Sequence, residues 1–162
     1  MLRLSKLTDY AVVVLVRLAQ SNVAGDTTGT MQTSPGIAAT TGIPEPTVAK
    51  VLKTLAGGGL VASQRGARGG YRLLRPLAAI PIGDVIAAID GPIALTACVD
   101  GSVGGCESEG LCPVRGRWDP VNAAIQEALG AITLAHMQEA AIPRAFRVPP
   151  AAGAARLLPA AE

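Results

Sequence analysis

The chain has 162 residues, of which 49% are hydrophobic and only 2% aromatic, and its formal net charge is +2 at pH 7. This length suffices for one domain with a buried core and an extension, and the core must be built mainly from Ala, Val, Leu and Ile. No stretch approaches the roughly 18 apolar residues of a membrane span, and nothing resembles a secretory signal. We therefore expect a cytoplasmic protein with reduced thiols and no membrane association.

The charge is unevenly distributed along the chain. Residues 1–75 hold nine Lys and Arg against three acidic residues, a net charge of +6, whereas residues 76–162 hold five against nine, a net charge of −4. A basic first half and an acidic second half favour a nucleic-acid-binding region followed by a region with a different function. The alternative is a solvated surface of mixed charge.

The first predicted helix begins after a Ser5 cap and runs to about Gln20, followed by a polar loop over residues 21–33. One face of this helix is apolar at helical spacing and should lie in the core; it consists of Leu7, Ala11, Val14, Leu15 and Leu18.

A short helix, a turn and a second helix follow. Ser34 is the expected cap of a helix over 35–41, with Pro35 at its first position and Gly42 at its end. The next helix has an apolar stripe at Val48, Val51, Leu52 and Leu55, and Gly57, Gly58 and Gly59 end it. This is a helix-turn-helix pattern. The opposite face suits DNA phosphates and base edges; its side chains are Thr47, Lys50, Lys53 and Thr54, with Glu45 at the start of the helix.

A predicted hairpin comes next, with strands at 60–64 and 71–74. A hairpin after a helix-turn-helix is a wing. Its glycine-rich tip presents Arg65, Gly66 and Arg68 to a minor groove, and Arg72 and Arg75 are expected to contact phosphates. The combination predicts binding to an operator in double-stranded DNA.

Two further helices are expected. One covers residues 82–90. A long one, with Asp119 as its expected cap and Pro120 at its first position, continues to about Ala141. The long helix carries a coiled-coil seam that predicts a homodimer, the alternative being packing on its own domain; the seam consists of Val121, Ile125, Ala128, Ile132 and Ala135. Residues 142–162 are rich in Pro and Ala and are predicted to be a disordered tail.

All three cysteines lie between the last two helices. Seven residues separate Cys98 from Cys106 and five separate Cys106 from Cys112, among Gly, Ser, Asp and Glu. A glycine-rich loop can bring several thiolates to one point, which favours a metal or iron–sulfur site. The alternatives are a thiol switch with a disulfide such as Cys106–Cys112, a zinc-stabilised interaction module, and inert buried cysteines.

The expected fold is mainly α with a small β-hairpin: a winged helix-turn-helix plus a long C-terminal dimerisation helix. Residues 1–80 form the DNA-binding domain and residues 81–141 the sensor and dimerisation region, with the cysteine loop at 97–117 and the long helix at 119–141. We expect neither enzymatic activity nor a small-molecule substrate, because no base or phosphate-binding loop accompanies the cysteines.

The chain resembles the Rrf2 family of bacterial transcription regulators over most of residues 1–140. The resemblance is carried by the opening MLRLSKLTDYA, the wing run GLVASQRGARGGYRL, the three-cysteine loop and the run ITLAHM. Within the family it is most similar to the regulators of iron–sulfur cluster assembly operons, of the SUF-regulator type. Nitric-oxide sensors share the same loop.

The resemblance implies a homodimer in which Cys98, Cys106 and Cys112 hold a 2Fe-2S or 4Fe-4S cluster that tunes DNA affinity. In two-iron members a histidine stands three positions after the third cysteine; here that residue is Arg115, which cannot ligate iron. Asp9 matches an acidic residue that reaches the partner's cluster in some members, and it is the candidate fourth ligand. The alternative for Asp9 is a charge favoured at a helix N-terminus. His136, the single histidine, is expected to be a surface or packing residue.

Overall fold

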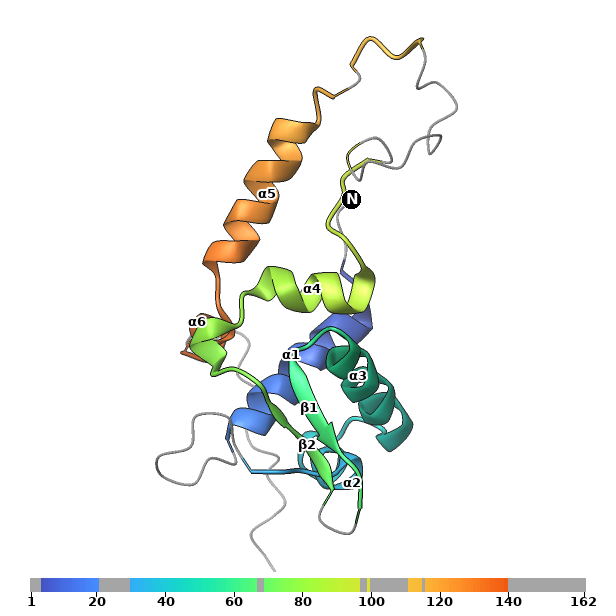
Figure 1. Ribbon diagram of the computed structural model, residues 1–162, viewed down its shortest axis with the longest axis vertical. Coiled ribbons are helices and arrows are strands. Elements are labelled where there is room, and N and C mark those ends of the chain that lie inside the picture. The colour runs from blue at the N-terminus through green and yellow to red at the C-terminus, as the bar shows by residue number, and fades with distance from the viewer. Residues whose placement is uncertain are drawn as a thin grey trace, which may run out of the picture.

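The computed structural model describes residues 4–20, 30–66, 69–96, 99, 111–114 and 116–139. These residues are mainly helical, with one two-stranded antiparallel hairpin, as predicted. The elements are α1 (Lys6–Ala19), α2 (Ser34–Thr41), α3 (Glu45–Gly57), β1 (Val61–Gln64), β2 (Gly70–Leu73), the 3-10 turn η1 (Leu77–Ala79), α4 (Ile82–Asp90), α5 (Asp119–Ala131) and α6 (Leu134–Glu139). Helices α1 to α3 and the hairpin gather on one side of α4, and α5 rises on the other side (Figure 1).

Helices α1 and α3 form the centre of the core, and their predicted apolar stripes are confirmed. The buried side chains are Ala11, Val14, Leu15 and Leu18 on α1 and Val48, Val51, Leu52 and Leu55 on α3, while Leu7 of the predicted α1 stripe is partly buried against this core. Burial of each Leu stabilises the fold by about 1.5–3 kcal/mol. The Ser5 hydroxyl caps α1 by accepting a hydrogen bond of 3.2 Å from the Thr8 amide, also as predicted.

Helix α2 begins one residue earlier than the sequence suggests, so the prediction of Ser34 as its cap is wrong. The cap is Thr33, which has an extended backbone (ψ 154°) and whose hydroxyl accepts a hydrogen bond of 3.3 Å from the Gly36 amide. Ser34 is already helical. Either hydroxyl can cap a helix, and the extended backbone of Thr33 decides between them. Gly42 ends α2 in the left-handed conformation (φ 72°), as expected.

The hairpin pairs Val61 with Leu73 and Gln64 with Gly70. A third segment joins the hairpin at Gln32, a residue predicted to lie in a loop, through an isolated antiparallel bridge to Tyr71. The Gln32 amide donates to the Tyr71 carbonyl at 2.9 Å and its carbonyl accepts from the Tyr71 amide at 2.7 Å. The Gln32 side-chain amide also donates to the carbonyls of Arg17 and Leu18 at the end of α1. Gln32 thus joins the wing to α1.

Helix α4 has the predicted bounds, but the single long helix predicted from Asp119 to about Ala141 is wrong in the described residues. Helix α5 ends at Ala131, Ile132 is extended (φ −95°, ψ 117°) and α6 begins at Leu134. The cause is a tertiary pairing: the Ile132 carbonyl accepts from the Ile82 amide at 2.8 Å, and the Leu134 amide donates to the Ile80 carbonyl at 2.9 Å.

The start of α5 also differs in detail from the prediction. Trp118 occupies the cap position without a side-chain hydrogen bond, and Asp119 lies in the first turn instead of capping the helix. A carboxylate there still favours the helix through its interaction with the N-terminal dipole. Among the described residues no helix is long and apolar enough to cross a membrane.

Candidate nucleic-acid interface and cysteine segment

The recognition face predicted for α3 is open to solvent. Glu45, Lys50 and Lys53 are exposed and Thr47 is partly exposed, while the opposite face of α3 is buried. The turn before α3 is fixed by Ile43, whose side chain is 7% exposed and belongs to the core. The core therefore holds α3 with its two lysines facing outward, as DNA-phosphate contacts require.

The wing adds cations beside α3. Arg65 and Gly66 lie at the described part of its tip, and Gly66 has a positive φ of 111° that favours glycine. Arg72 is exposed on β2. The predicted contact residue Arg68 lies outside the described residues.

A hollow of about 320 Å³ separates the wing from α3. Two cations, Lys53 and Arg65, lie on its lining. The remaining lining residues are Ala56, Ser63, Gln64, Gly70 and Tyr71. The positive charges of helix and wing thus border one concave surface, which favours approach of a polyanion.

Arg75, expected to contact phosphates, has other partners. Its guanidinium donates to Asp84 Oδ2 at 2.9 Å and to the Ala79 carbonyl at 3.2 Å. Through these contacts Arg75 joins the end of the hairpin to α4, and its contact with phosphates stays a prediction.

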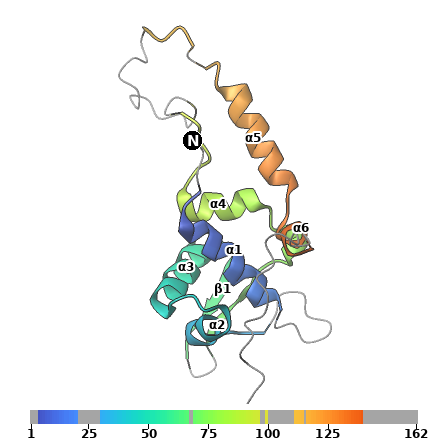
Figure 2. The ribbon, with the colours of Figure 1, turned by 180° about the vertical axis from the view of Figure 1, so that it is seen from behind.

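The cysteine segment is described in part. Cys112 carries a free thiol and is partly buried, whereas Cys98 and Cys106 lie outside the described residues. Asp9 is exposed on α1. Residues 111–114 and 116–118 lie beyond α4, away from α1, in both views (Figures 1 and 2). One chain therefore does not bring Asp9 beside the stretch that contains Cys112, and within the described residues no three potential metal ligands gather.

His136 has a structural role at the start of α6. Its Nδ1 accepts a hydrogen bond of 3.2 Å from the Thr133 amide, and its own amide donates to Thr133 Oγ1 at 3.4 Å. This reciprocal pair resembles a capping box. His136 is exposed, which agrees with the expectation of a surface or packing residue.

Two polar side chains are buried among the described residues, and sequence reasoning missed both. Thr8 is 1% exposed and donates to Asp90 Oδ2 at 2.6 Å. Asn122 is 4% exposed and binds the backbone of Ile93 and Leu95. One sequence signal could have indicated Asn122. Asn has a low helix propensity, so an Asn in the second turn of a predicted helix suggests a specific hydrogen-bonding role.

The pKa of Asp90 reflects its position at the end of α4. Partial burial acts to raise this pKa, but hydrogen bonds from Thr8 and from the side chain and backbone of Ser5 outweigh it and hold the pKa below its ordinary value. Asp90 is thus stabilised as a carboxylate beside the N-terminus of α1.

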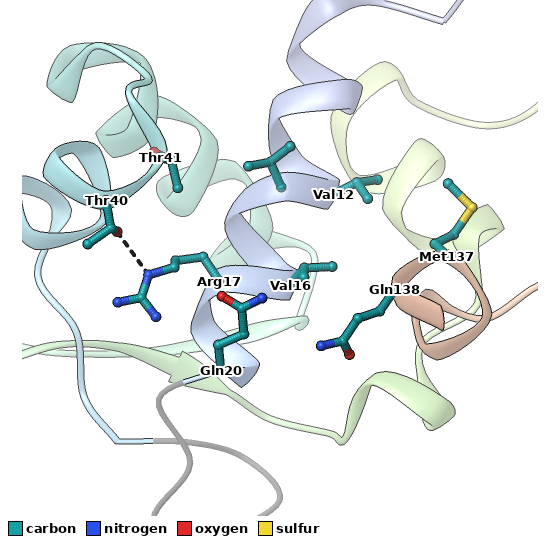
Figure 3. A pocket seen from close by; sticks show the side chains of 9 residues that line it. Val12, Val16, Arg17, Gln20, Thr40, Thr41, Met137 and Gln138 are labelled. Atoms are coloured by element: carbon teal, nitrogen blue, oxygen red, sulfur yellow. Dashed lines mark hydrogen bonds between the residues drawn. The ribbon is translucent and has the colours of Figure 1, made fainter. Parts of the chain in front are cut away.

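An open hollow of about 530 Å³ lies along α1, between α2 and α6 (Figure 3). Its apolar side chains are Val12, Val13, Val16 and Met137. Arg17 Nε donates to Thr40 Oγ1 at 2.9 Å across it and joins α1 to α2. This face leaves Val13 43% and Met137 47% exposed in the single chain.

Comparison with known proteins identifies the family. The Rrf2 family model, described as iron-dependent transcriptional regulator, matches residues 4–140. The chain belongs to the Rrf2 family. A relative named as an HTH-type transcriptional regulator, Rv1287 of Mycobacterium tuberculosis, is 34% identical over 143 residues, which cover 88% of this chain and 84% of the relative.

Solved Rrf2-like structures share the fold. CymR, the global cysteine regulator of B. subtilis, is 28% identical with a TM-score of 0.60, and the match covers 85% of this chain and 96% of CymR. IscR of T. potens is 29% identical with a TM-score of 0.58, covering 92% and 94%. The chain is therefore a DNA-binding transcriptional regulator with the winged helix-turn-helix of the Rrf2 family, and not an enzyme.

Proposed function

We propose that this Rrf2 regulator is a homodimer whose affinity for an operator in double-stranded DNA is tuned by an iron–sulfur cluster, and that it controls iron–sulfur cluster assembly genes in the cytoplasm. The observation that carries the proposal is the free thiol of Cys112, in a stretch that also holds Cys98 and Cys106. The description of the family as iron-dependent supports an iron centre. The resemblance of the sequence to regulators of iron–sulfur cluster assembly operons supports the choice of target genes.

The donor set fits an iron–sulfur centre. Three thiols within one short stretch are the ligands that iron–sulfur clusters take in proteins, and the partly exposed Cys112 is reachable by incoming iron. Cys98, Cys106 and Cys112 would hold a 2Fe-2S or 4Fe-4S cluster through their thiolates. When bound, it would supply a charged, oxidisable centre whose loss frees the three cysteines.

Asp9 is proposed as a fourth ligand that acts across the dimer. It is exposed on α1, and the stretch containing Cys112 lies away from α1 of the same chain, so its carboxylate is free to meet a second copy. A carboxylate binds iron more weakly than a thiolate does, which suits a sensor. Asp9→Ala should weaken iron retention while the dimer persists; unchanged iron retention would contradict this role.

The apolar stripe of α5 supports the dimer. Val121 is 44% exposed, and Trp118 before it and Ile132 after it are each 42% exposed. Exposed apolar side chains on α5 and at both of its ends mark an interaction surface. A second copy covering this stripe would set the spacing between the two α3 helices, which a two-fold operator reads.

Coupling between the two functions follows from this arrangement. Lys50 and Lys53 on α3 and Arg65 on the wing bind the DNA backbone, and the spacing of the two copies decides whether both sets bind at once. Thiolates on one copy and Asp9 on the other would tie that spacing to occupancy of the cysteine stretch. Operator affinity would then differ between loaded and unloaded dimers.

The experiment compares loaded and unloaded protein purified without oxygen. Visible absorption with iron and sulfide assays measures loading, and fluorescence anisotropy measures affinity for a duplex selected from random sequence, at one fixed salt concentration. The control is the triple variant Cys98→Ser, Cys106→Ser and Cys112→Ser. We expect a coloured wild-type protein, a colourless control and different affinities for the two states. Equal affinities would contradict the proposal.

The same Cys112 thiol supports one alternative, a cluster-free thiol switch through a Cys106–Cys112 disulfide. A wild-type protein that stays colourless after reconstitution, but changes DNA affinity on oxidation, would establish the switch in place of the cluster.

A further inference from the structure

The connector from α4 toward the first cysteine, residues 90–95, is held from two sides. Thr8 of α1 donates to Asp90 at its start, and Asn122 of α5 binds Ile93 and Leu95 at its end. These are the two buried polar side chains of the described chain. Buried polar groups are costly unless they are paired, and a fully paired one fixes a single arrangement.

Asn122 binds the connector as a neighbouring strand would. Its Oδ1 accepts from the Leu95 amide at 3.1 Å, and its Nδ2 donates to the Ile93 carbonyl at 3.1 Å. Gln126, one turn further along α5, donates to the same Ile93 carbonyl at 3.0 Å. Loss of the Asn122 amide would leave both connector groups without this partner in a partly buried place.

The contact between Asn122 and the connector joins residues on either side of the cysteines in the sequence. Leu95 comes three residues before Cys98, and Asn122 comes ten residues after Cys112. The contact therefore joins the two ends of the stretch that contains all three cysteines, and the connector runs alongside α5 in both views (Figures 1 and 2). Fixing the ends of a loop raises the effective concentration of groups within it for one another.

We propose that Asn122 is a positioning residue for the cysteine ligands: by closing the stretch between Leu95 and α5, it raises the effective concentration of Cys98 for Cys112. The proposal rests on the proposed function in taking these cysteines as the ligands. It adds a residue that touches no metal and acts through the backbone of the connector.

The test uses the metal-free full chain with Cys106→Ser, which leaves two thiols. Equilibration with glutathione disulfide converts the two thiols into the Cys98–Cys112 disulfide and releases two glutathione thiols, so the equilibrium constant reports their effective concentration. Asn122→Leu removes both hydrogen bonds, and Asn122→Asp keeps the size and the acceptor but loses the donor to Ile93. Glu127→Ala, at an exposed position of the same helix, is the control.

We expect Asn122→Leu to lower the effective concentration about threefold, the factor by which loop closure changes when the flexible chain between two groups doubles in length, and Glu127→Ala to leave it unchanged. A variant that is merely less stable but folded by circular dichroism at the assay temperature keeps the wild-type value. Wild-type values in both Asn122 variants would overturn the proposal. If Asn122→Leu does not fold, Asn122→Asp decides.

A second readout uses the three-cysteine chain reconstituted with iron and sulfide. Iron should pass to a chelator several-fold faster from Asn122→Asp than from Glu127→Ala, and equal rates would count against positioning. Failure of the wild type to take up iron would refute the proposed cluster but not the positioning, because the glutathione equilibrium needs no iron.

Discussion

The Thr8 hydroxyl donates a hydrogen bond of 2.6 Å to Asp90 Oδ2, joining residues 82 positions apart in the chain. Asp90 is the last residue of α4, and Thr8 lies in the first turn of α1. The Ser5 amide donates to the same oxygen at 3.3 Å. One carboxylate therefore anchors the start of the DNA-binding domain to the base of the connector that leads to the cysteines.

Replacing Thr8 by Val should destabilise the chain. Thr8→Val keeps the shape of a buried side chain but removes a hydrogen bond to a charged group, which costs about 1–3 kcal/mol in the free energy of unfolding. Urea denaturation at neutral pH measures the change. The control is Thr54→Val, whose hydroxyl only bonds back to the Lys50 carbonyl within α3. Equal stabilities of the two variants would show that the contact to Asp90 contributes nothing.

Asp90 should also make stability depend on pH. Because the folded-state pKa of Asp90 lies below its ordinary value of 3.8, the carboxylate contributes stability above that value and loses it as pH falls through the folded-state pKa. Asp90→Asn lacks this contribution. The gap in free energy of unfolding between wild type and Asp90→Asn should therefore be largest near neutral pH and shrink below about pH 4. A gap that stays constant on acidification would refute the role of the charge.

Local patterns predicted most of the DNA-binding half, and long-range hydrogen bonds explain most of what they missed. The stripes of α1 and α3 depend on spacing within one helix, so the sequence reveals them. The break at Ile132 depends on Ile80 and Ile82, about fifty residues earlier in the chain, and helical periodicity continues through it. Gln32 and Asn122 bind backbone groups that no local pattern singles out.

Gly70 should be intolerant of a side chain. An added Cβ would lie 2.6 Å from the Gln32 carbonyl oxygen, a backbone atom that pairs with the hairpin, and φ is 158°. Gly70→Ala should cost about 1–3 kcal/mol in stability and weaken DNA binding by displacing the wing. Gly57→Ala, where a Cβ meets nothing within 4 Å, should change stability by less than about 1 kcal/mol. Denaturation curves of the two variants that coincide would contradict this account.

The cations of α3 and the wing should determine how DNA affinity depends on salt. Lys50→Ala and Arg65→Ala should each weaken binding at every sequence and reduce the slope of log affinity against log salt by about 1. Arg75→Ala is the matched control, because its guanidinium is already held by Asp84 and the Ala79 carbonyl. Anisotropy titrations between about 50 and about 200 mM salt measure the slopes. If the salt dependence of DNA binding is reduced more by Arg75→Ala than by Arg65→Ala, Arg65 of the wing is not the phosphate contact.

The exposed stripe of α5 should hold the dimer together. Val121→Glu would bury a carboxylate between two copies without a partner, so we expect the dimer dissociation constant to rise at least about tenfold. The control is Ala123→Glu, an exposed position about 200° around the same helix. Sedimentation velocity over a range of concentrations measures the dissociation constant of both. Because a two-fold operator needs two α3 helices at a fixed spacing, Val121→Glu should lose DNA affinity in parallel, while Ala123→Glu keeps it. Two results would contradict a role of α5 in the dimer interface. One is wild-type protein that sediments as a monomer at every concentration, and the other is an equal dimer dissociation constant for Val121→Glu and Ala123→Glu.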